Sequence, residues 1–208
     1  MTLVEAEQLL DVLVDKANNP YFTNAEKRDF LELAVTDFIE KYYTVYDINE
    51  QSRAALKGFT QNSSSTTGAS VIPLSDEHIY TLAVNVQYWH TNAVAIGSTA
   101  RNKSYVQAKQ VSVAEFRATA DPFSGPSYDN PIYTYTTSAG GVPQIDILPA
   151  DSIQNKNYYF IERQDLANIF DNSRVEETYQ HEIVQIAARK MLASIESPNY
   201  EIQSQEAN

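Results

Sequence analysis

The chain has 208 residues, 43% of them hydrophobic, which is enough for one well-packed domain or two small ones. Its 27 acidic residues outnumber its 15 basic ones and leave a net charge of −12. This balance disfavours nucleic-acid binding, because that affinity comes mainly from Lys and Arg displacing counterions. Cysteine is absent, which excludes disulfides, thiol nucleophiles and thiolate metal sites.

The N-terminal stretch MTLVEAEQLLDVLVDK carries acids throughout and has no basic flank, so we expect no signal peptide there. No apolar run approaches the roughly 20 residues of a membrane-spanning helix. We therefore expect the protein to be made in the cytoplasm and not to enter a membrane.

Residues 1–58 are predicted to form two or three helices that pack on one another. Thr2 and Glu5 have the spacing of a capping box. An apolar row follows at helical steps, made of Leu3, Ala6, Leu10 and Leu13. Asn18-Asn19-Pro20 ends this helix. A second helix begins near Asn24 and carries a wide apolar stripe, made of Phe30, Leu31, Ala34, Val35, Phe38 and Tyr42.

A short third helix is predicted to open at Asp47, three residues before Glu50, and to end near Gly58. Glycine is typical of the first position beyond a helix, where the backbone turns left-handed. The next stretch, TQNSSSTTGAS at residues 60–70, is polar and of low complexity, so it is predicted to be a loop with nothing to bury.

From residue 71 to about residue 161 the sequence changes to short runs rich in β-branched and aromatic residues, separated by Gly and Pro. Residues 79–88 alternate so that one face is apolar, which favours a strand. Ser75-Asp76-Glu77 could also begin a helix there, but the valines and Trp89 suit a pleated surface better.

The remaining β-rich sequence predicts more strands and one helical turn. Ser112 and Glu115 have capping-box spacing and mark a one-turn helix through Ala118. Gly140-Gly141 favours a hairpin turn. The strands are expected at residues 105–111, 132–136, 144–148 and 157–162.

The last helix has the clearest pattern. Glu176 and Glu177 stand near its start and Arg189 and Lys190 toward its end, which matches the helix dipole. One face carries a strict four-residue row, made of Tyr179, Ile183, Ala187, Met191 and Ile195. Pro198 ends it, and a polar tail follows.

The expected fold class is α+β, a helical bundle with a β-rich insertion. The N-terminal helices (1–58) and the long C-terminal helix (173–197) form the bundle, residues 59–172 form the insertion, and 198–208 form a flexible tail. The wide apolar face of the last helix needs partners, and only the N-terminal helices are available to cover it. Two independent domains are the alternative, which leaves the last helix poorly covered.

Motifs of enzyme chemistry are missing from the sequence. The zinc-protease pattern begins at His181-Glu182 but fails, because Gln185 stands where the second histidine is required. There is no glycine-rich phosphate loop and no nucleophile elbow. We therefore expect no enzymatic activity, no cofactor and no metal. Four residues could in principle converge on a metal ion, although ordinary structural roles explain them more simply: Asp76, Glu77, His78 and His90.

Several stretches in a fixed order carry a resemblance to a known family. After the helical opening they are IPLSDEHIYTLAVNV, VSVAEFRATADPFSGPSYDNPIYTY, IDILPA, NYYFIER and HEIVQIAARKMLASIESPNY, which together cover most of the chain. This succession resembles the head-to-tail connector proteins (portal adaptors, or ring proteins) of short-tailed bacteriophages, including crAss-like phages. The chain departs from the family where Arg163 is followed by Gln164-Asp165-Leu166 rather than by a proline, which leaves the conformation of 163–172 open.

The resemblance implies a helical bundle with a β-rich insertion, a twelve-subunit ring beneath the portal, and no enzymatic activity. It implies that the protein lies in the virion, at the head-to-tail interface. The expected partners are further copies of the chain, the portal protein and neighbouring tail or ring proteins. DNA is expected to pass through the channel without specific binding.

Aromatic residues are the expected contact points, because the chain has 14 tyrosines and such rings favour interfaces. Residues 116–135 contain three prolines and are predicted to form a stiff extended arm that contacts a neighbouring subunit. A surface loop and strand within one subunit is the alternative. The C-terminal tail is expected to dock on the portal. The proposed interaction residues are Phe123, Tyr128, Tyr133, Tyr135, Tyr200 and Ile202. A carbohydrate- or host-binding β-rich module is the second functional hypothesis.

Overall fold

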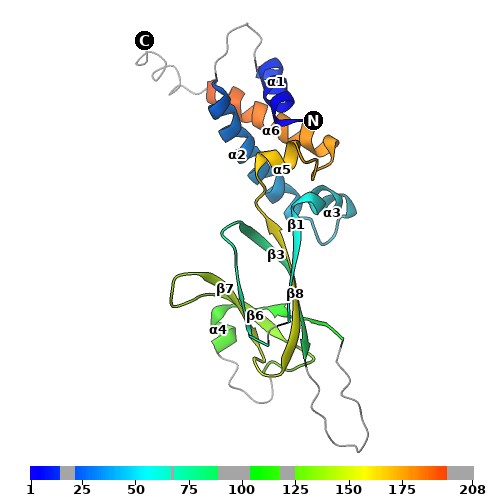
Figure 1. The fold of residues 1–208 in the computed structure, drawn as a ribbon, viewed down its shortest axis with the longest axis vertical. Coiled ribbons are helices and arrows are strands. Elements are labelled where there is room, and N and C mark those ends of the chain that lie inside the picture. Colours follow the sequence, from blue (N-terminus) through cyan, green and yellow to red (C-terminus); the bar gives the residue numbers. More distant parts are fainter. Residues whose placement is uncertain (15–21, 67, 89–103, 118–124, 196–208) are drawn as a thin grey trace, which may run out of the picture. The chain divides into compact units, whose positions relative to one another are not determined.

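A computed structural model describes residues 1–14, 22–66, 68–88, 104–117 and 125–195. Within these residues the class is α+β, as the sequence predicted, with six α-helices and two four-stranded sheets (Figure 1). The chain divides into two compact units. We call Met1–Phe59 with Gln164–Asn208 the helical unit, and Thr60–Arg163 the β unit.

The helical unit is built from both ends of the chain. Its elements are α1 (Leu3–Val14), α2 (Asn24–Tyr43), α3 (Glu50–Leu56), a 3-10 turn (Lys57–Phe59), α5 (Leu166–Phe170) and α6 (Glu177–Ile195). α6 packs against both α1 and α2 (Figure 1). The predicted capping box at the start of α1 is confirmed: the Thr2 amide donates to Glu5 Oε2 at 2.7 Å, and the Glu5 amide donates to Thr2 Oγ1 at 3.2 Å.

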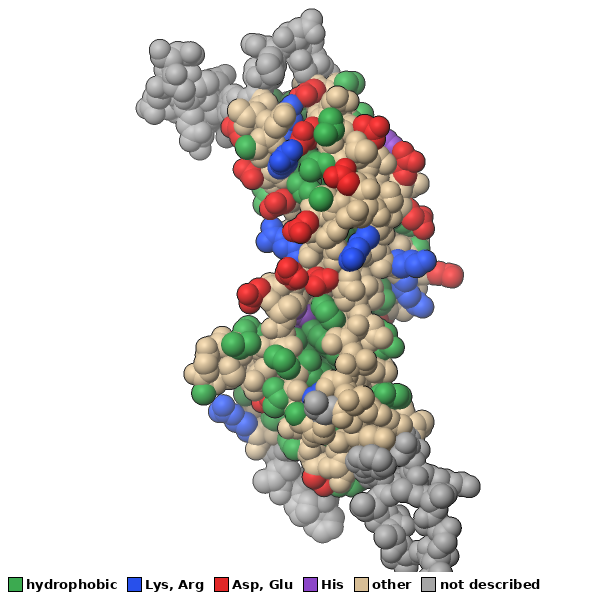
Figure 2. All heavy atoms as spheres, viewed as in Figure 1, with side chains coloured by type: hydrophobic (Ala, Val, Ile, Leu, Met, Phe, Trp, Pro, Cys, Tyr) green, Lys and Arg blue, Asp and Glu red, His purple; other side chains and the backbone are tan. Residues whose placement is uncertain are grey.

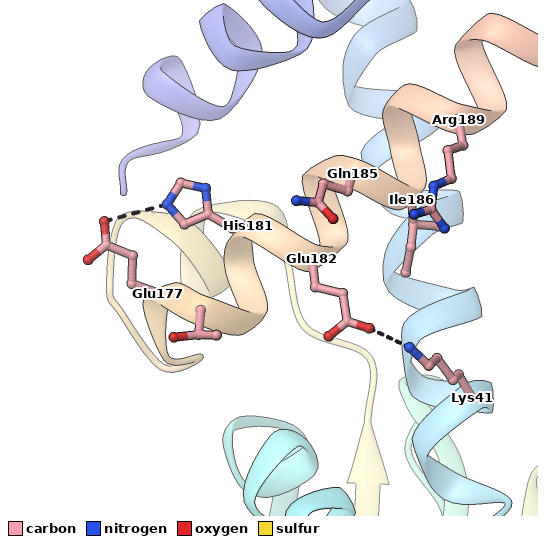
Figure 3. A pocket seen from close by; sticks show the side chains of 8 residues that line it. Lys41, Glu177, His181, Glu182, Gln185, Ile186 and Arg189 are labelled. Atoms are coloured by element: carbon pink, nitrogen blue, oxygen red, sulfur yellow. Dashed lines mark hydrogen bonds and ion pairs between the residues drawn. The ribbon is translucent and has the colours of Figure 1, made fainter.

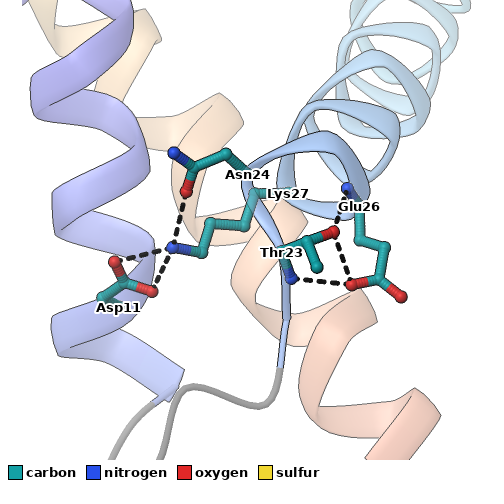
Figure 4. A network of polar contacts seen from close by, with 5 residues as sticks. All are labelled: Asp11, Thr23, Asn24, Glu26 and Lys27. Atoms are coloured by element: carbon teal, nitrogen blue, oxygen red, sulfur yellow. Dashed lines mark hydrogen bonds and ion pairs between the residues drawn. The ribbon is translucent and has the colours of Figure 1, made fainter.

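A second polar network joins the start of α2 to α1 (Figure 4). Thr23 and Glu26 form a reciprocal capping box at the first turn of α2. Lys27, only 5% exposed, places Nζ 2.6 Å from Asp11 Oδ1 and 3.3 Å from Asn24 Oδ1. The lysine therefore ties the two helices together at a buried position where its charge is matched.

The core of the helical unit is the seam between α6 and the first two helices. Ile183, Ala187 and Met191 are buried, which confirms most of the predicted row, and Ile195 at its end is partly exposed. The ring of Phe38 lies at the centre, with centroids 4.8 Å from Tyr42, 6.0 Å from Phe59 and 6.0 Å from Tyr179. Ala34 of α2 and Ala187 of α6 are both fully buried in this unit.

Three details of the helical unit differ from the sequence prediction. Val14 is buried in α1, whereas Leu13 is 37% exposed. Asn49, rather than Asp47, caps α3, because its side chain accepts from the Gln51 amide at 2.9 Å. Gly58 does not have a left-handed backbone. Its lack of a side chain is explained instead by close approach, since a Cβ there would lie 2.4 Å from the Arg174 carbonyl oxygen.

The stretch after the last strand forms α5, a helix that the sequence did not predict. Ile169 and Phe170 of α5 are buried, and the Gln180 side chain donates to the Ile169 carbonyl at 2.6 Å. These contacts join residues 164–172 to the helical unit, whereas the sequence assigned them to the β-rich insertion.

The β unit contains two sheets. The first has the order β1 (Thr60–Ser65), β8 (Ile153–Glu162), β3 (His78–Tyr88), β4 (Val106–Gln107). The second has the order β2 (Val71–Pro73), β7 (Pro143–Leu148), β6 (Ile132–Thr137), β5 (Lys109–Gln110). All neighbours are antiparallel except β5 and β6, and α4 (Val113–Arg117) follows β5. Residues of both sheets share one core, made of Ile72, Val84, Val86, Tyr88, Ala108, Tyr133, Ile145, Ile147, Ile153 and Tyr158.

The predicted strands within residues 79–88, 132–136, 144–148 and 157–162 are all present. Gly141 has the positive φ of 82° that the β6–β7 turn requires. The predicted turn of helix after Ser112 is also present as α4, with Ser112 and Glu115 bonded reciprocally.

Two predictions in the β unit are wrong. Residues 60–65 form β1, an edge strand paired with β8, not a loop. Backbone pairing with β8 holds this strand in place. Its side chains are all polar, so the sequence shows no alternation of apolar and polar residues that would predict a strand. The expected single strand at 105–111 is divided at buried Ala108 into β4 and β5, which belong to different sheets.

We predict that Ala187→Asp destabilises the helical unit, because Ala187 is fully buried and the new carboxylate has no partner there. The expected loss in free energy of unfolding is about 3–5 kcal/mol. Chemical denaturation measures it. Gln185→Asp, at an exposed position of the same helix, is the control. Equal stability of both variants would contradict the packing of this seam.

We predict that Gly58→Ala also destabilises the fold, because its Cβ would meet backbone atoms of Arg174 that cannot move aside like a side chain. The expected cost is about 1–3 kcal/mol. Gly140→Ala is the control, since the nearest atom to its Cβ is Ser138 Oγ at 3.8 Å. A stable Gly58→Ala protein would mean that the close approach is absent.

Candidate interaction surface

An open groove of about 870 Å³ runs along α6 where this helix meets the end of α2 (Figure 3). α2 contributes Lys41. The residues of α6 follow one another at helical spacing and so share one face: Glu177, Thr178, His181, Glu182, Gln185, Ile186 and Arg189. We call this feature the α2–α6 groove.

Glu182 is the polar centre of the groove. Its Oε1 lies 2.6 Å from Lys41 Nζ, and its Oε2 accepts from the Tyr42 hydroxyl at 2.8 Å. Burial raises the pKa of Tyr42 to about 12, and the hydrogen bond to Glu182 contributes in the same direction. The phenol is therefore protonated at neutral pH, and the three groups form a clamp between the two helices.

The chemistry available in the groove is limited. His181 Nε2 lies 3.9 Å from Glu177 Oε1, and both side chains are exposed to water. The Lys41 charge is matched by Glu182, while Arg189 forms no ion pair with any residue that the structure describes. The guanidinium of Arg189 offers five donors in a planar fork. This arrangement is suited to polar contact with another protein.

Large apolar side chains are also exposed on the helical unit: Ile48, between α2 and α3, is 83% exposed, and five more lie on the helices themselves. Val12 is 74% exposed, Val4 57% and Leu33 53%, and Leu13 and Leu192 are exposed to a smaller degree. In Figure 2 hydrophobic side chains lie at the surface of this unit among Asp and Glu. We call these five residues the exposed apolar set. The sequence contains the signal for part of it, since LVEAEQLLDVLV in α1 has apolar residues on more than one face.

The structure describes three of the six residues expected to make contacts. Tyr133 is 5% exposed and packs in the core of its own β unit. Tyr128 and Tyr135 are partly buried against the same core. The Tyr128 hydroxyl donates to Asp151 Oδ2 at 2.5 Å, and its ring lies 5.1 Å from that of Tyr88.

Tyr133 therefore faces the core from β6 and is buried within its own subunit. Of the described part of residues 116–135, Pro131, Tyr133 and Thr134 are buried within the subunit, while Arg117, Ser127, Asp129 and Asn130 are exposed. Contact of this stretch with a neighbouring subunit stays a prediction. Phe123, Tyr200 and Ile202 lie outside the described residues.

Three of the four residues considered as metal ligands, Asp76, Glu77 and His78, are described by the structure. Within the described ranges no three His, Asp or Glu residues form a group that could hold a metal ion. His78 Nε2 lies 3.1 Å from Thr81 Oγ1, and the imidazole ring lies 5.9 Å from the ring of Tyr158. Burial lowers the pKa of His78, so the ring is neutral and serves in the aromatic packing. His90 lies outside the described residues.

Comparison with known proteins gives no family for the chain. No protein-family model matches it. No curated protein matches it significantly. Among the helices that the structure describes, none combines the length and apolar character needed to cross a membrane.

We predict that Tyr42 titrates near pH 12 in the folded protein and that Glu182→Gln lowers its pKa. The substitution removes the negative charge beside the phenol, while burial continues to hold the pKa above that of free tyrosine. The Cζ chemical shift of isotopically labelled tyrosine reports this titration. Because the folded pKa is raised, this group stabilises the fold below pH 10, and the contribution is lost as the pH rises toward 12. An unchanged Tyr42 pKa in Glu182→Gln would show that the clamp does not form.

Proposed function

We propose that the chain is a structural virion protein that forms a connector ring between the portal and the tail. Twelve copies would surround a channel for packaging and ejection of the genome. The proposed subunit is a helical bundle made by both ends of the chain, with the β-rich region as an insertion. The protein would be made in the host cytoplasm and reach the virion by assembly, without enzymatic activity or cofactor.

The observation that carries this proposal is the exposed apolar set on the helical unit. Isolated apolar side chains at a surface are common, but Val4, Val12 and Leu33 are each more than half exposed on a unit of only five helices among the described residues. Each subunit of a closed ring meets its two neighbours through two different faces. The exposed apolar set is distributed over three helices, α1, α2 and α6.

The charge of the chain supports the proposed passage of DNA. Each copy carries a formal net charge of −12, so a ring of many copies is strongly negative. A basic channel wall would bind the duplex by releasing counterions and would hold it. An acidic or neutral wall repels phosphate within about 8 Å at physiological salt, the Debye length, so the duplex can slide.

A carbohydrate- or host-binding role receives less support. Such sites present exposed aromatic rings as platforms. Among the residues that the structure describes in the β unit, Tyr105 is exposed at 43%, whereas Tyr88, Tyr133 and Tyr158 are buried in the core. These three buried tyrosines thus serve the packing of their own unit.

The test is assembly with the portal protein encoded by the same genome. We expect electron microscopy of the mixture to show a ring of this chain on the portal, and mass spectrometry to find the chain in purified virions. Val12→Glu and Leu33→Glu should weaken assembly at least about thirtyfold, as loss of an interface hot spot does. Their thermal midpoints should stay near that of the wild type, since surface substitutions change stability little.

Gln8→Glu, an exposed polar position on α1, is the matched control and should assemble normally. If the wild-type chain neither binds the portal nor occurs in virions, the connector function is wrong. If the wild-type chain assembles on the portal, and Val12→Glu and Leu33→Glu assemble as well as the wild type does, the connector function stands but the exposed apolar set is not the interface.

A further inference from the structure

A cavity of about 320 Å³ opens in the β unit beside its first strand. Ser63 and Ser65 of β1, residues 71–73 of β2, and Lys156 and Tyr158 of β8 line it. β1 and β2 are each the outermost strand of their sheet, so the cavity lies between the edges of the two sheets. Its volume is at the lower end of the roughly 300–1,000 Å³ typical of small-molecule sites.

The sequence of β1 explains why the cavity exists. Ser63 is directly opposite Tyr158 and Ser65 is directly opposite Lys156, so these four side chains share one face of the first sheet. Tyr158 belongs to the core between the sheets, which fixes that face as the inner one. Two stacked sheets lie about 10 Å apart, and serine is too small to fill its share of that space. The core therefore stops at β8 and leaves a hollow under β1.

Lys156 is a buried cation that has no counter-charge among the residues described by the structure. It is 3% exposed, and its Nζ donates to the carbonyl oxygens of Ala69 at 2.5 Å and Val71 at 2.6 Å. An ammonium group has three N–H donors, and its bonds to described residues use two of them. No described residue forms an ion pair with Lys156, and burial lowers its pKa. A buried charge of this kind is costly unless an anion matches it.

The surroundings of Lys156 define which anion fits. Burial raises the pKa of Tyr158, so its phenol is neutral. Ile72 and Pro73 supply an apolar wall, and Ser63 supplies a hydroxyl at the open side. One cation beside an apolar wall suits a singly charged group with an apolar stem, whereas a phosphate dianion would need more donors.

We propose that this cavity binds a carboxylate, with Lys156 as the counter-charge and Ile72 and Pro73 against the carbon stem. The carboxylate can belong to a small molecule or to an Asp or Glu side chain of another polypeptide. The site lies wholly within the β unit and does not depend on the connector function.

The first experiment titrates the isotopically labelled protein with sodium acetate and sodium propionate, at an ionic strength held constant with sodium chloride. We expect saturable changes in the amide resonances of the residues that line the cavity, with propionate binding more tightly because its longer stem contacts the apolar wall. Ser63→Leu fills the hollow without removing Lys156 and should weaken binding at least about tenfold.

Ser64→Leu is the matched control, because Ser64 is exposed on the opposite face of the same strand and its variant should bind as the wild type does. Lys156→Gln keeps a hydrogen-bond donor for the carbonyls but removes the charge, and it should also lose binding. If Lys156→Gln does not fold, the comparison of Ser63→Leu with Ser64→Leu still decides the question.

The second experiment separates the two sources of the carboxylate. A zero-length carbodiimide cross-linker is applied to the purified chain, alone and with the portal protein, and the products are analysed by mass spectrometry. An amide bond between Lys156 Nζ and an acidic residue of another polypeptide identifies a protein ligand. Saturable acetate and propionate binding without such a cross-link identifies a small-molecule site. The absence of both, or binding that Ser63→Leu leaves unchanged, overturns the proposal and makes Lys156 a purely structural donor to the two carbonyls.

Discussion

The contact on which the helical unit depends is the packing of α6 against α1 and α2. It joins residues 177–195 to residues 3–43, so the two ends of the chain must meet before either can bury its apolar face. Isolated helices of this length are marginal in water, and most of their stability comes from tertiary packing. Phe38 and Ala187, both fully buried, stand at the centre of that seam, and the Lys41–Glu182–Tyr42 clamp closes one side of it. A substitution in the seam therefore affects the whole unit, whereas one on the exposed apolar set acts on the surface alone.

Local patterns in the sequence were enough to predict most helices and strands, because each pattern has a local physical cause. The capping box of Thr2 and Glu5 and the row through Ile183 and Ala187 are complete within one or two helical turns. β1 shows the opposite case. It forms by backbone pairing with β8, about 90 to 100 positions later in the chain, and its serines and asparagine show no alternation of apolar and polar residues. Gly58 shows another limit, since its neighbour Arg174 lies far along the chain and no local rule predicts that approach.

The candidate sites were less predictable than the fold, because they too depend on contacts between distant parts of the chain. The sequence indicated tyrosines as contact residues, but whether a ring faces inward depends on the register of its strand, and Tyr133 of β6 faces the core. The cavity at Lys156 arises because β1 places small side chains opposite Lys156 and Tyr158, which only the pairing reveals. The surplus of apolar residues in α1 was visible in the sequence. Ala6 and Leu10 mark the buried face of α1, and the apolar residues on its other faces remain exposed.

The two proposed surfaces belong to different compact units, and this separates their effects. The exposed apolar set lies on α1, α2 and α6, whereas the carboxylate cavity is lined by β1, β2 and β8. Distant substitutions that share no partner usually add in free energy. A Leu33→Glu, Ser63→Leu double variant should then show the sum of the single effects on assembly if the two surfaces meet different partners. A double variant that loses no more than the worse single variant would place both surfaces in one binding event. With that outcome, the carboxylate would be an acidic side chain of the same partner, and it would reach Lys156 only after the helical contact has formed.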